Sequence, residues 1–182
     1  MEKKRFIIVL IFIGVMVFQS CTNSNPDSSK SPAIDKEQLT QQIKQLEDTL
    51  KAKAEQQIDR KLAKELINKS VAYVEAFPDD ELSPAYLFRA GNVAVGISSF
   101  EEAANYFEMI HQKYTSYKRA PDALFLEGFT YENHLKDIEK AKKCYNDFLT
   151  RYPDDQLADQ VRIVLENIDK TPEELVKSFQ KK

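Results

Sequence analysis

The chain has 182 residues and a formal net charge of −3, and 30% of its residues are charged. A mildly acidic chain with scattered lysines is poorly suited to binding nucleic acid. Four glycines and seven prolines are too few for a β-sandwich with many turns. Long runs of Ala, Leu, Glu, Lys and Gln favour helix instead, so we expect an all-α protein.

Residues 1–20 have the pattern of a signal peptide. A basic stretch at 3–5 precedes an unbroken apolar run at 6–18, followed by Ser20 and Cys21. As a helix, at about 1.5 Å per residue, that run is too short for the ~30 Å core of a bilayer. The small residue before Cys21 resembles the lipobox of bacterial lipoproteins. The resemblance implies cleavage before Cys21 and acylation of its thiol, for example with palmitate. An ordinary secreted protein with an incidental cysteine, or an uncleaved anchor, stays open as an alternative.

Residues 21–34 are the predicted link between lipid and domain. After Cys21 they are rich in Ser, Asn, Pro and Asp and nearly devoid of large apolar side chains. Such a segment buries too little surface to offset the loss of chain entropy. We therefore expect a flexible tether, followed by a helix that Asp35 caps.

Residues 35–56 are predicted to form a helical stalk. Their apolar residues have the alternating 4-3-4 spacing of a short coiled-coil seam, and these residues are Leu39, Ile43, Leu46 and Leu50. Two interpretations stay open. The seam joins copies of the chain in a homo-oligomer through 36–56, or the helix is solvated or rests on its own domain.

The second half of the chain repeats itself. Pro84–Gly91 recurs 37 residues later as Pro121–Gly128, and Phe100–Phe107 recurs 38 residues later as Ile138–Tyr145. A period of this size predicts stacked pairs of helices. An aromatic residue precedes each turn between units, at Phe77, Tyr114 and Tyr152.

The repeated residues resemble the tetratricopeptide repeat (TPR) family. Small residues at its Gly and Ala positions let paired helices approach closely, and aromatic residues fill the space between pairs. The residues at the family's positions are Gly91, Ala94, Ala103 and Phe107 in the first unit, and Gly128, Tyr131, Ala141, Tyr145 and Pro153 in the second. The resemblance implies a short TPR-type helical solenoid preceded by a long amino-terminal helix. The chain departs from the family in lacking Trp, in having Ala94 where the family has Tyr, and in a period of 37 or 38 residues, longer than the family's 34. The second unit has one extra residue between its helices.

The repeat register divides the rest of the chain into four parts. A half-repeat helix with its turn precedes two full units, and a partial third repeat with a polar capping helix follows them. Thr171 begins the predicted capping box of that last helix. The boundaries are 57–82, 83–119 (TPR 1), 120–157 (TPR 2) and 158–182.

No catalytic, cofactor-binding or metal-binding motif is present in the sequence, and we expect the protein not to be an enzyme. His111 and His134 are predicted to be surface or partly buried helical residues rather than ligands. The acidic pairs 79–80 and 154–155 fit turn and cap chemistry better than calcium binding. Cys144 is predicted to be a small buried hydrophobe.

By resemblance to TPR proteins, the first helices of successive pairs line a groove. Two aligned aromatic residues with polar neighbours suit an extended or helical peptide. The alternative is that a terminal helix covers these aromatics as core. The groove positions are Phe88, Asn92, Val95, Phe125, Phe129, Glu132 and Asn133.

The plan of the chain resembles that of envelope TPR lipoproteins. Examples are the TPR lipoprotein of the outer-membrane β-barrel assembly machinery and the periplasmic coiled-coil and TPR protein that works with Tol-Pal. The resemblance implies a lipid-anchored adaptor for a protein or peptide partner in the bacterial envelope, at the outer membrane and facing the periplasm. The alternative function is a structural accessory subunit of a membrane or surface complex, assembled through the stalk helix.

Overall fold

The computed structural model describes residues 35–53, 58–171, 173–174 and 176–177. Over these residues the chain forms helices and no strand, which confirms the all-α prediction. The elements are α1 (Lys36–Ala52), α2 (Arg60–Ala76), α3 (Ser83–Gly96), α4 (Phe100–Lys113), α5 (Ala120–Thr130), the π-helical turn η1 (Tyr131–Leu135), α6 (Ile138–Arg151) and α7 (Ala158–Asn167). The signal peptide, Cys21 and the tether lie outside the described residues.

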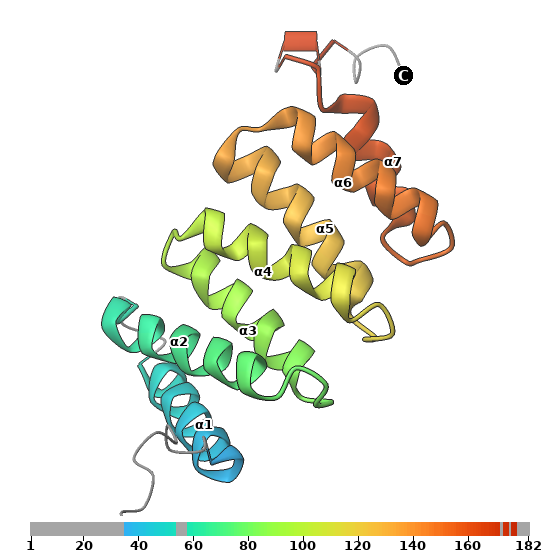
Figure 1. Ribbon diagram of the computed structural model, residues 1–182. Coiled ribbons are helices and arrows are strands. Elements are labelled where there is room, and N and C mark those ends of the chain that lie inside the picture. Colours follow the sequence, from blue (N-terminus) through green and yellow to red (C-terminus); the bar gives the residue numbers. More distant parts are fainter. Residues whose placement is uncertain (1–34, 54–57, 172, 175, 178–182) are drawn as a thin grey trace, which may run out of the picture. The chain divides into compact units, whose positions relative to one another are not determined.

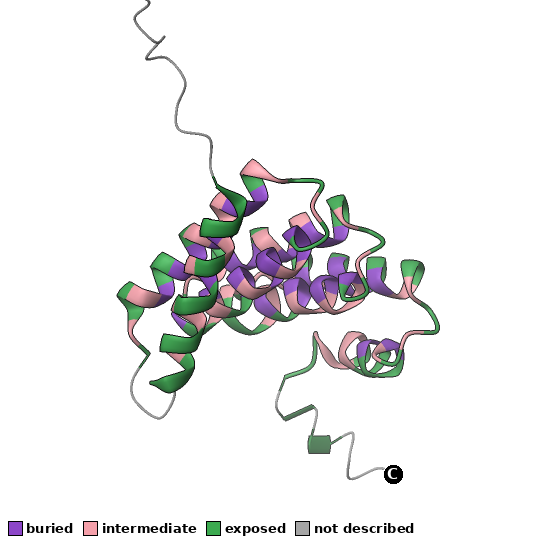
Figure 2. Cartoon of the chain, turned by 90° about the horizontal axis from the view of Figure 1, so that it is seen from below, coloured by how far each residue is buried: buried purple, intermediate pink, exposed green. Residues whose placement is uncertain are grey.

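Each helix packs mainly on the helix that follows it in the chain (Figure 1). The buried residues lie where successive helices face one another, and the outer faces are more exposed (Figure 2). Serial packing of neighbours is the defining property of a helical solenoid. The predicted short TPR-type solenoid is therefore confirmed.

The helix expected to be a stalk, α1, is part of the array. It is the first helix of the array and pairs with α2. Leu39 and Ile43 of its apolar seam are buried, and Leu46 and Leu50 pack half-buried against the same core. Of the two interpretations that the sequence left open, the structure therefore shows the helix resting on its own domain. The 4-3-4 spacing arises because one face of α1 contacts the helices of its own chain.

Polar contacts at both ends of α1 fix its position. Asp35 caps the helix, its carboxylate accepting from the amides of Glu37 at 2.9 Å and Gln38 at 3.2 Å, as predicted. Ion pairs join Lys36 to Asp80, in the turn after α2, and Glu47 to Arg89 on α3. The first ion pair ties α1 to the turn after its partner helix, and the second ties α1 to the helix pair that follows.

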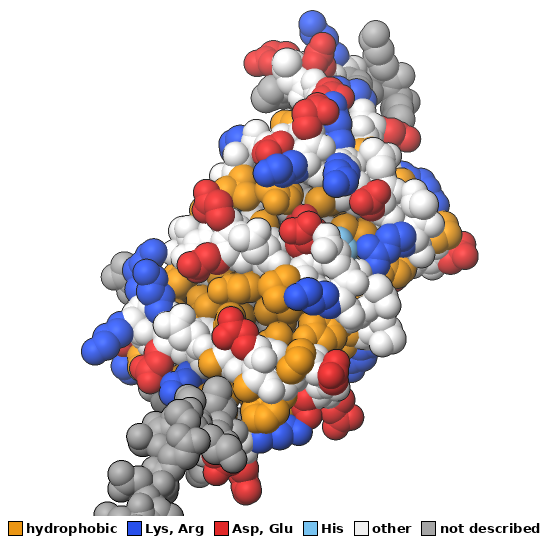
Figure 3. All heavy atoms as spheres, in the orientation of Figure 1, with side chains coloured by type: hydrophobic (Ala, Val, Ile, Leu, Met, Phe, Trp, Pro, Cys, Tyr) orange, Lys and Arg blue, Asp and Glu red, His pale blue; other side chains and the backbone are white. Residues whose placement is uncertain are grey.

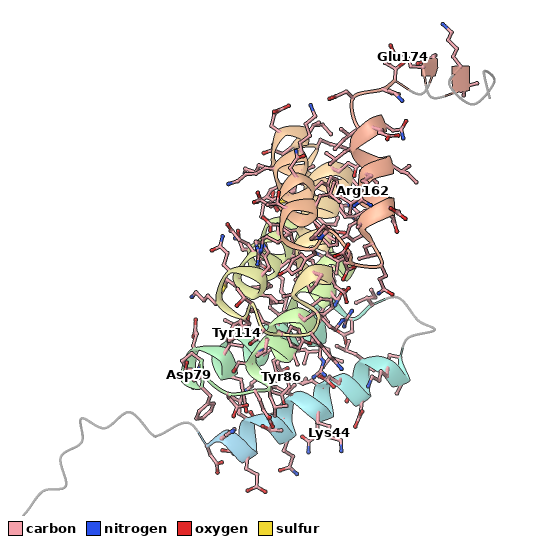
Figure 4. The ribbon with its side chains drawn as sticks, turned by 90° about the vertical axis from the view of Figure 1, so that its right-hand side faces the viewer. Lys44, Asp79, Tyr86, Tyr114, Arg162 and Glu174 are labelled. Atoms are coloured by element: carbon pink, nitrogen blue, oxygen red, sulfur yellow. The ribbon has the colours of Figure 1, made fainter. Side chains whose placement is uncertain are left out.

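The turn between units recurs three times with the same hydrogen bonds. In the first turn the amide of Asp80 donates to the carbonyl of Phe77, and the amide of Ser83 donates to that of Asp80. The equivalent bonds are Tyr117 to Tyr114 and Ala120 to Tyr117 in the second turn, and Asp155 to Tyr152 and Ala158 to Asp155 in the third. Figure 4 shows Asp79 and Tyr114, from the first two turns, on the same side of the array.

Acidic residues in these turns serve the backbone. The carboxylates of Asp80 and Asp155 each accept a bond of 2.9 Å from the amide two residues further on. This is the local bonding for which aspartate is favoured in turns. It confirms the expected turn chemistry for these two residues.

The extra residue of the second unit is absorbed by a π-helical turn. Here α5 passes directly into η1, and Lys136, the residue after η1, has a left-handed φ of 57°. In the first unit α3 ends instead at Gly96, and Ser98 has the left-handed backbone. A π-turn adds one residue to a helical turn without breaking the helix, so the packing of α5 on α6 is kept.

The carboxy-terminal part begins with α7, which packs on α6 and whose Ala158 and Val161 are buried in a core shared with residues of α5 and α6. Beyond it, the amide of Thr171 donates to the carboxylate of Glu174, and the amide of Glu174 donates to the hydroxyl of Thr171. These reciprocal bonds confirm the predicted capping box.

Candidate protein-binding surface

Three residues occupy equivalent positions on the first helices of successive units. They are Phe88 on α3, Phe125 on α5 and Ile163 on α7, separated by 37 and 38 residues. Their exposure increases along the chain, because Phe88 is 3% exposed, Phe125 is half-buried and Ile163 is 60% exposed. The predicted groove face is therefore not uniform.

Phe88 is a core residue rather than a groove residue, which corrects the sequence-based expectation. Its ring packs edge-on against Phe107, with the ring centroids 5.8 Å apart. The guanidinium of Arg119, just before α5, lies 3.7 Å from the centre of the Phe88 ring. Arg119 is the last residue of the same unit, so the ring is covered by a residue 31 positions away in the sequence.

The aromatic residues of α5 are more accessible. Phe129 is 41% exposed and lies 6.3 Å, centre to centre, from the half-buried Phe125. Phe125 in turn packs against Tyr145 of α6 at 6.0 Å, which holds the pair in place. We refer to Phe125, Phe129 and Ile163 together as the α5–α7 surface.

The polar groove residues mainly serve the helices that carry them. The side-chain amides of Asn92 and Asn133 donate to the carbonyls one turn earlier, at 2.9 and 3.2 Å, and both residues are exposed. Glu132 accepts a 2.7 Å bond from the hydroxyl of Tyr145, so its carboxylate joins η1 to α6. Val95 is half-buried against the core.

An aromatic contact that the sequence reasoning missed lies beside Phe129. The ring of His134, in η1, stacks on Phe100 at the start of α4, with centroids 4.1 Å apart and an angle of 3° between the planes. Phe129 meets the same imidazole edge-on at 6.1 Å. The π-helical turn carries His134 and places its ring on Phe100. The sequence indicated one extra residue in the second unit, but it did not indicate that a π-helical turn would accommodate that residue.

A polar trio built around a buried pair was also missed. His111 of α4 and Glu127 of α5 are both 6% exposed, and the Nε2 atom of His111 lies 2.5 Å from the Glu127 carboxylate. Arg151 of α6 donates to His111 Nδ1 at 3.0 Å and to the His111 carbonyl at 2.7 Å. Since arginine can only donate, Nδ1 accepts and Nε2 carries the proton given to Glu127. The expectation of a surface or partly buried position was wrong for His111.

Residues 122–155 match the tetratricopeptide repeat family. The chain contains a tetratricopeptide repeat. The matched segment runs from α5 through the turn after α6, which is the second unit of the sequence register. No curated protein matches the chain. A TPR indicates a role in protein–protein interaction, and proteins built from such repeats are generally scaffolds rather than enzymes.

Electrostatics around the TPR do not favour nucleophilic chemistry. Burial, followed by the neighbouring Glu127 carboxylate, raises the pKa of the Cys144 thiol well above its usual range, so it stays protonated at neutral pH. Burial and the carboxylate of Glu127 likewise raise the pKa of Tyr131 to about 12. Among the described residues, no three His, Cys, Asp or Glu side chains are grouped as a metal site would need.

Proposed function

We propose that the chain is an adaptor that binds a partner protein through the α5–α7 surface. One observation carries this proposal. Phe129 on α5 and Ile163 on α7 are large apolar residues on first helices of the repeat array, and each is about half exposed. Large apolar residues at such positions are the usual anchors of a protein interface. Phe125, held by Tyr145, gives the surface a rigid floor.

The adaptor acts in the bacterial cell envelope, held by lipid on Cys21. The support for this part is the sequence pattern of residues 1–21, with its basic start, apolar run and terminal Ser20-Cys21. No helix within the described residues is both long and apolar enough to cross a membrane. In this proposal the anchor lies in the outer membrane and the TPR array faces the periplasm.

Site-specific photocrosslinking tests the adaptor function. A benzophenone amino acid is placed at position 129 or 163 of the full chain in bacterial cells that produce it. The matched controls are Asn105, exposed on α4, and Lys44, exposed on α1. We expect one shared protein adduct from positions 129 and 163 and none from 105. The same adducts from all four positions, or none from 129 and 163, would contradict the proposal.

The Lys44 position also tests the second candidate function, assembly through the stalk helix. The seam of α1 is engaged inside the chain through Leu39 and Ile43, which leaves the polar face of that helix for any partner. An adduct from Lys44 alone would support a structural accessory subunit instead of an adaptor.

A further inference from the structure

The two most exposed large apolar residues of the described chain lie near each other in the sequence. Ile163 on α7 is 60% exposed, and Val176, beyond α7, is 56% exposed. Their sequence positions differ by 13. Every other large apolar residue that the structure describes is exposed by half or less. Two such side chains on neighbouring parts of one chain are favoured to share a contact that removes both from water.

The chain between these two residues makes a turn and then starts a new helix. The amide of Lys170 donates to the carbonyl of Asn167 at 2.9 Å, directly after α7 ends. The capping box at Thr171 follows, and this motif begins a helix. The connection, residues 168–171, is about as short as residues 97–99 between α3 and α4. Helices joined by so short a connection pack antiparallel to each other.

An antiparallel arrangement would place Val176 beside Ile163. Ile163 lies four residues before the end of α7 at Asn167, which is about 6 Å along the helix axis. Val176 lies five residues after Thr171, which is about 8 Å along the new helix. Both side chains are therefore at a similar distance from the connection that joins the two helices.

Residues 172–182, here named the carboxy-terminal segment, have the pattern of a short amphipathic helix. Leu175, Val176 and Phe179 have the spacing of one helical face, and the other residues after Pro172 are polar or charged. Isolated helices shorter than about 12–15 residues are marginal in water. A helix in this segment therefore needs a surface on which its apolar face can pack.

The charged residues of α7 determine which side of that helix is suitable. Arg162 and Glu166, both exposed, hold the repeat positions at which α5 has the buried residues Leu124 and Gly128. On α5 this face receives α6, because Gly128 lies against an aromatic ring of that helix. Charged side chains of both signs are spread over the α6 and α7 end of the array on the face that Figure 3 shows. A helix packed on α7 as α6 packs on α5 would bury two charges, so the suitable side of α7 is the one that presents Ile163.

We propose that the carboxy-terminal segment forms a helix that docks on α7 and covers Ile163, as an internal occupant of the α5–α7 surface. Because the connection is short, the effective concentration of the segment at that surface is on the order of millimolar. A partner protein then has to displace this helix, and this consequence rests on the proposed function. The docking itself does not depend on a partner.

Disulfide cross-linking within the full chain tests the docking. Ile163→Cys and Val176→Cys are introduced together with Cys21→Ala and Cys144→Ala, so that the new pair are the only two cysteines of the chain. Under mild oxidation, we expect a disulfide between positions 163 and 176 of the same chain. It should form at least about tenfold faster than the disulfide of a control pair, because docking raises the effective concentration.

The control pair is Asp169→Cys with Val176→Cys in the same background. Asp169 is exposed and nearer to Val176 in the sequence, and its carboxylate lies 2.7 Å from the ammonium of Lys142 on α6. An undocked segment would therefore form the control disulfide at least as fast. That result, or no disulfide between positions 163 and 176, would overturn the proposal. A disulfide that joins two chains would also overturn it, because the occupant would then be a second copy.

Two further variants test whether the apolar face drives the docking. Phe179→Asp places a charge on that face and should slow the disulfide between positions 163 and 176 at least about tenfold, because docking would bury the charge. Lys177→Gln makes the same change in net charge away from that face and should leave the rate unchanged. Equal rates in the two variants would contradict docking through the apolar face.

Photocrosslinking at position 129 separates this proposal from the proposed function. If the docked helix competes with a partner, Phe179→Asp should increase the partner adduct about twofold or more, since more of the surface becomes available. Lys177→Gln should not change the adduct. An adduct of equal yield in both variants would show that the segment does not compete. No adduct in any variant would contradict the proposed function alone, because the disulfide measurements involve no partner.

Discussion

The backbone of Gly91 lies against the ring of Phe107 so closely that a Cβ atom on the glycine would stand 2.6 Å from Phe107 Cε1. The same relationship recurs in the next unit, where a Cβ on Gly128 would stand 2.8 Å from Tyr145 Cε1. Both aromatic rings are completely buried. In each unit, the missing side chain of the first helix provides the space that the aromatic ring of the second helix fills.

Gly91→Ala and Gly128→Ala should each destabilise the protein by about 1–3 kcal/mol, through overpacking. Alanine is intrinsically the better helix former, so the loss would have a purely steric origin. Gly96→Ala is the matched control, because its Cβ meets only ordinary contacts among the described residues. It should leave stability unchanged or raise it by up to about 1 kcal/mol. Urea unfolding followed by circular dichroism measures all three. Equal losses at the three glycines would contradict this account of the packing.

Phe88→Ala and Phe129→Ala should differ sharply in stability. Phe88 is buried between Phe107 and Arg119, so its truncation should cost about 3–5 kcal/mol. Phe129 contributes mainly aromatic contacts at the surface, and its loss should cost about 0.5–1.5 kcal/mol. Thermal melts and partner capture are measured on the same two variants. A folded Phe129→Ala protein that still captures its partner at full strength would exclude the α5–α7 surface.

His111→Ala should cost about 3–5 kcal/mol, because it leaves the Glu127 carboxylate buried without its donor. The exposed pair of Arg162 and Asp159 provides the comparison, and Asp159→Ala should cost less than about 1 kcal/mol. A double-mutant cycle on His111 and Glu127 should give a coupling free energy of more than about 1 kcal/mol. Additive single losses would show that the two side chains act independently.

The free energy of unfolding should decrease as the pH rises above about 8.5, because of Cys144. The thiol ionises near that pH in the unfolded chain, whereas burial keeps it protonated in the folded state. The unfolded state then binds fewer protons, so the free energy of unfolding falls by up to about 1.4 kcal/mol per pH unit. Cys144→Ala should remove this slope, whatever its effect on stability at pH 7. Urea unfolding at pH 7.5, 8.5 and 9.5, measured in a Cys21→Ala background, tests this prediction. The same dependence of the free energy of unfolding on pH with and without Cys144 would refute it.

Cys21→Ala should leave the array folded but release the protein from membranes, or leave the signal uncleaved. Even a single acyl chain gives only marginal membrane binding, so the loss of all acylation should abolish anchoring. Cell fractionation and the mass of the mature amino terminus provide the measurement. Mature wild-type protein that is soluble and carries no lipid would contradict the lipoprotein hypothesis.

The repeated pattern in the sequence was sufficient to predict the helical pairs, the turns between them and the positions of closest packing. Gly91 and Phe107, like Gly128 and Tyr145, are 16 or 17 residues apart in the sequence and meet within a single helical pair. Such contacts depend on helix geometry and a short connection. The residue types at fixed spacing therefore carry the necessary information. The caps at Asp35 and Thr171 were predictable for the same reason, since their bonds span three residues or fewer.

Which faces stay exposed was decided by the tertiary structure. Phe88 and Phe125 hold equivalent positions in the repeat, yet Arg119 covers the first, and Ile163 at the third equivalent position is largely open. The seam of α1 reads equally well as a contact between chains or within one, because periodicity defines an apolar face and not what covers it. The bonds among His111, Glu127 and Arg151 join three helices from two units. Exposure and buried polar contacts depend on residues that lie far apart in the sequence and meet only in the folded array, and no local spacing encodes where those residues lie.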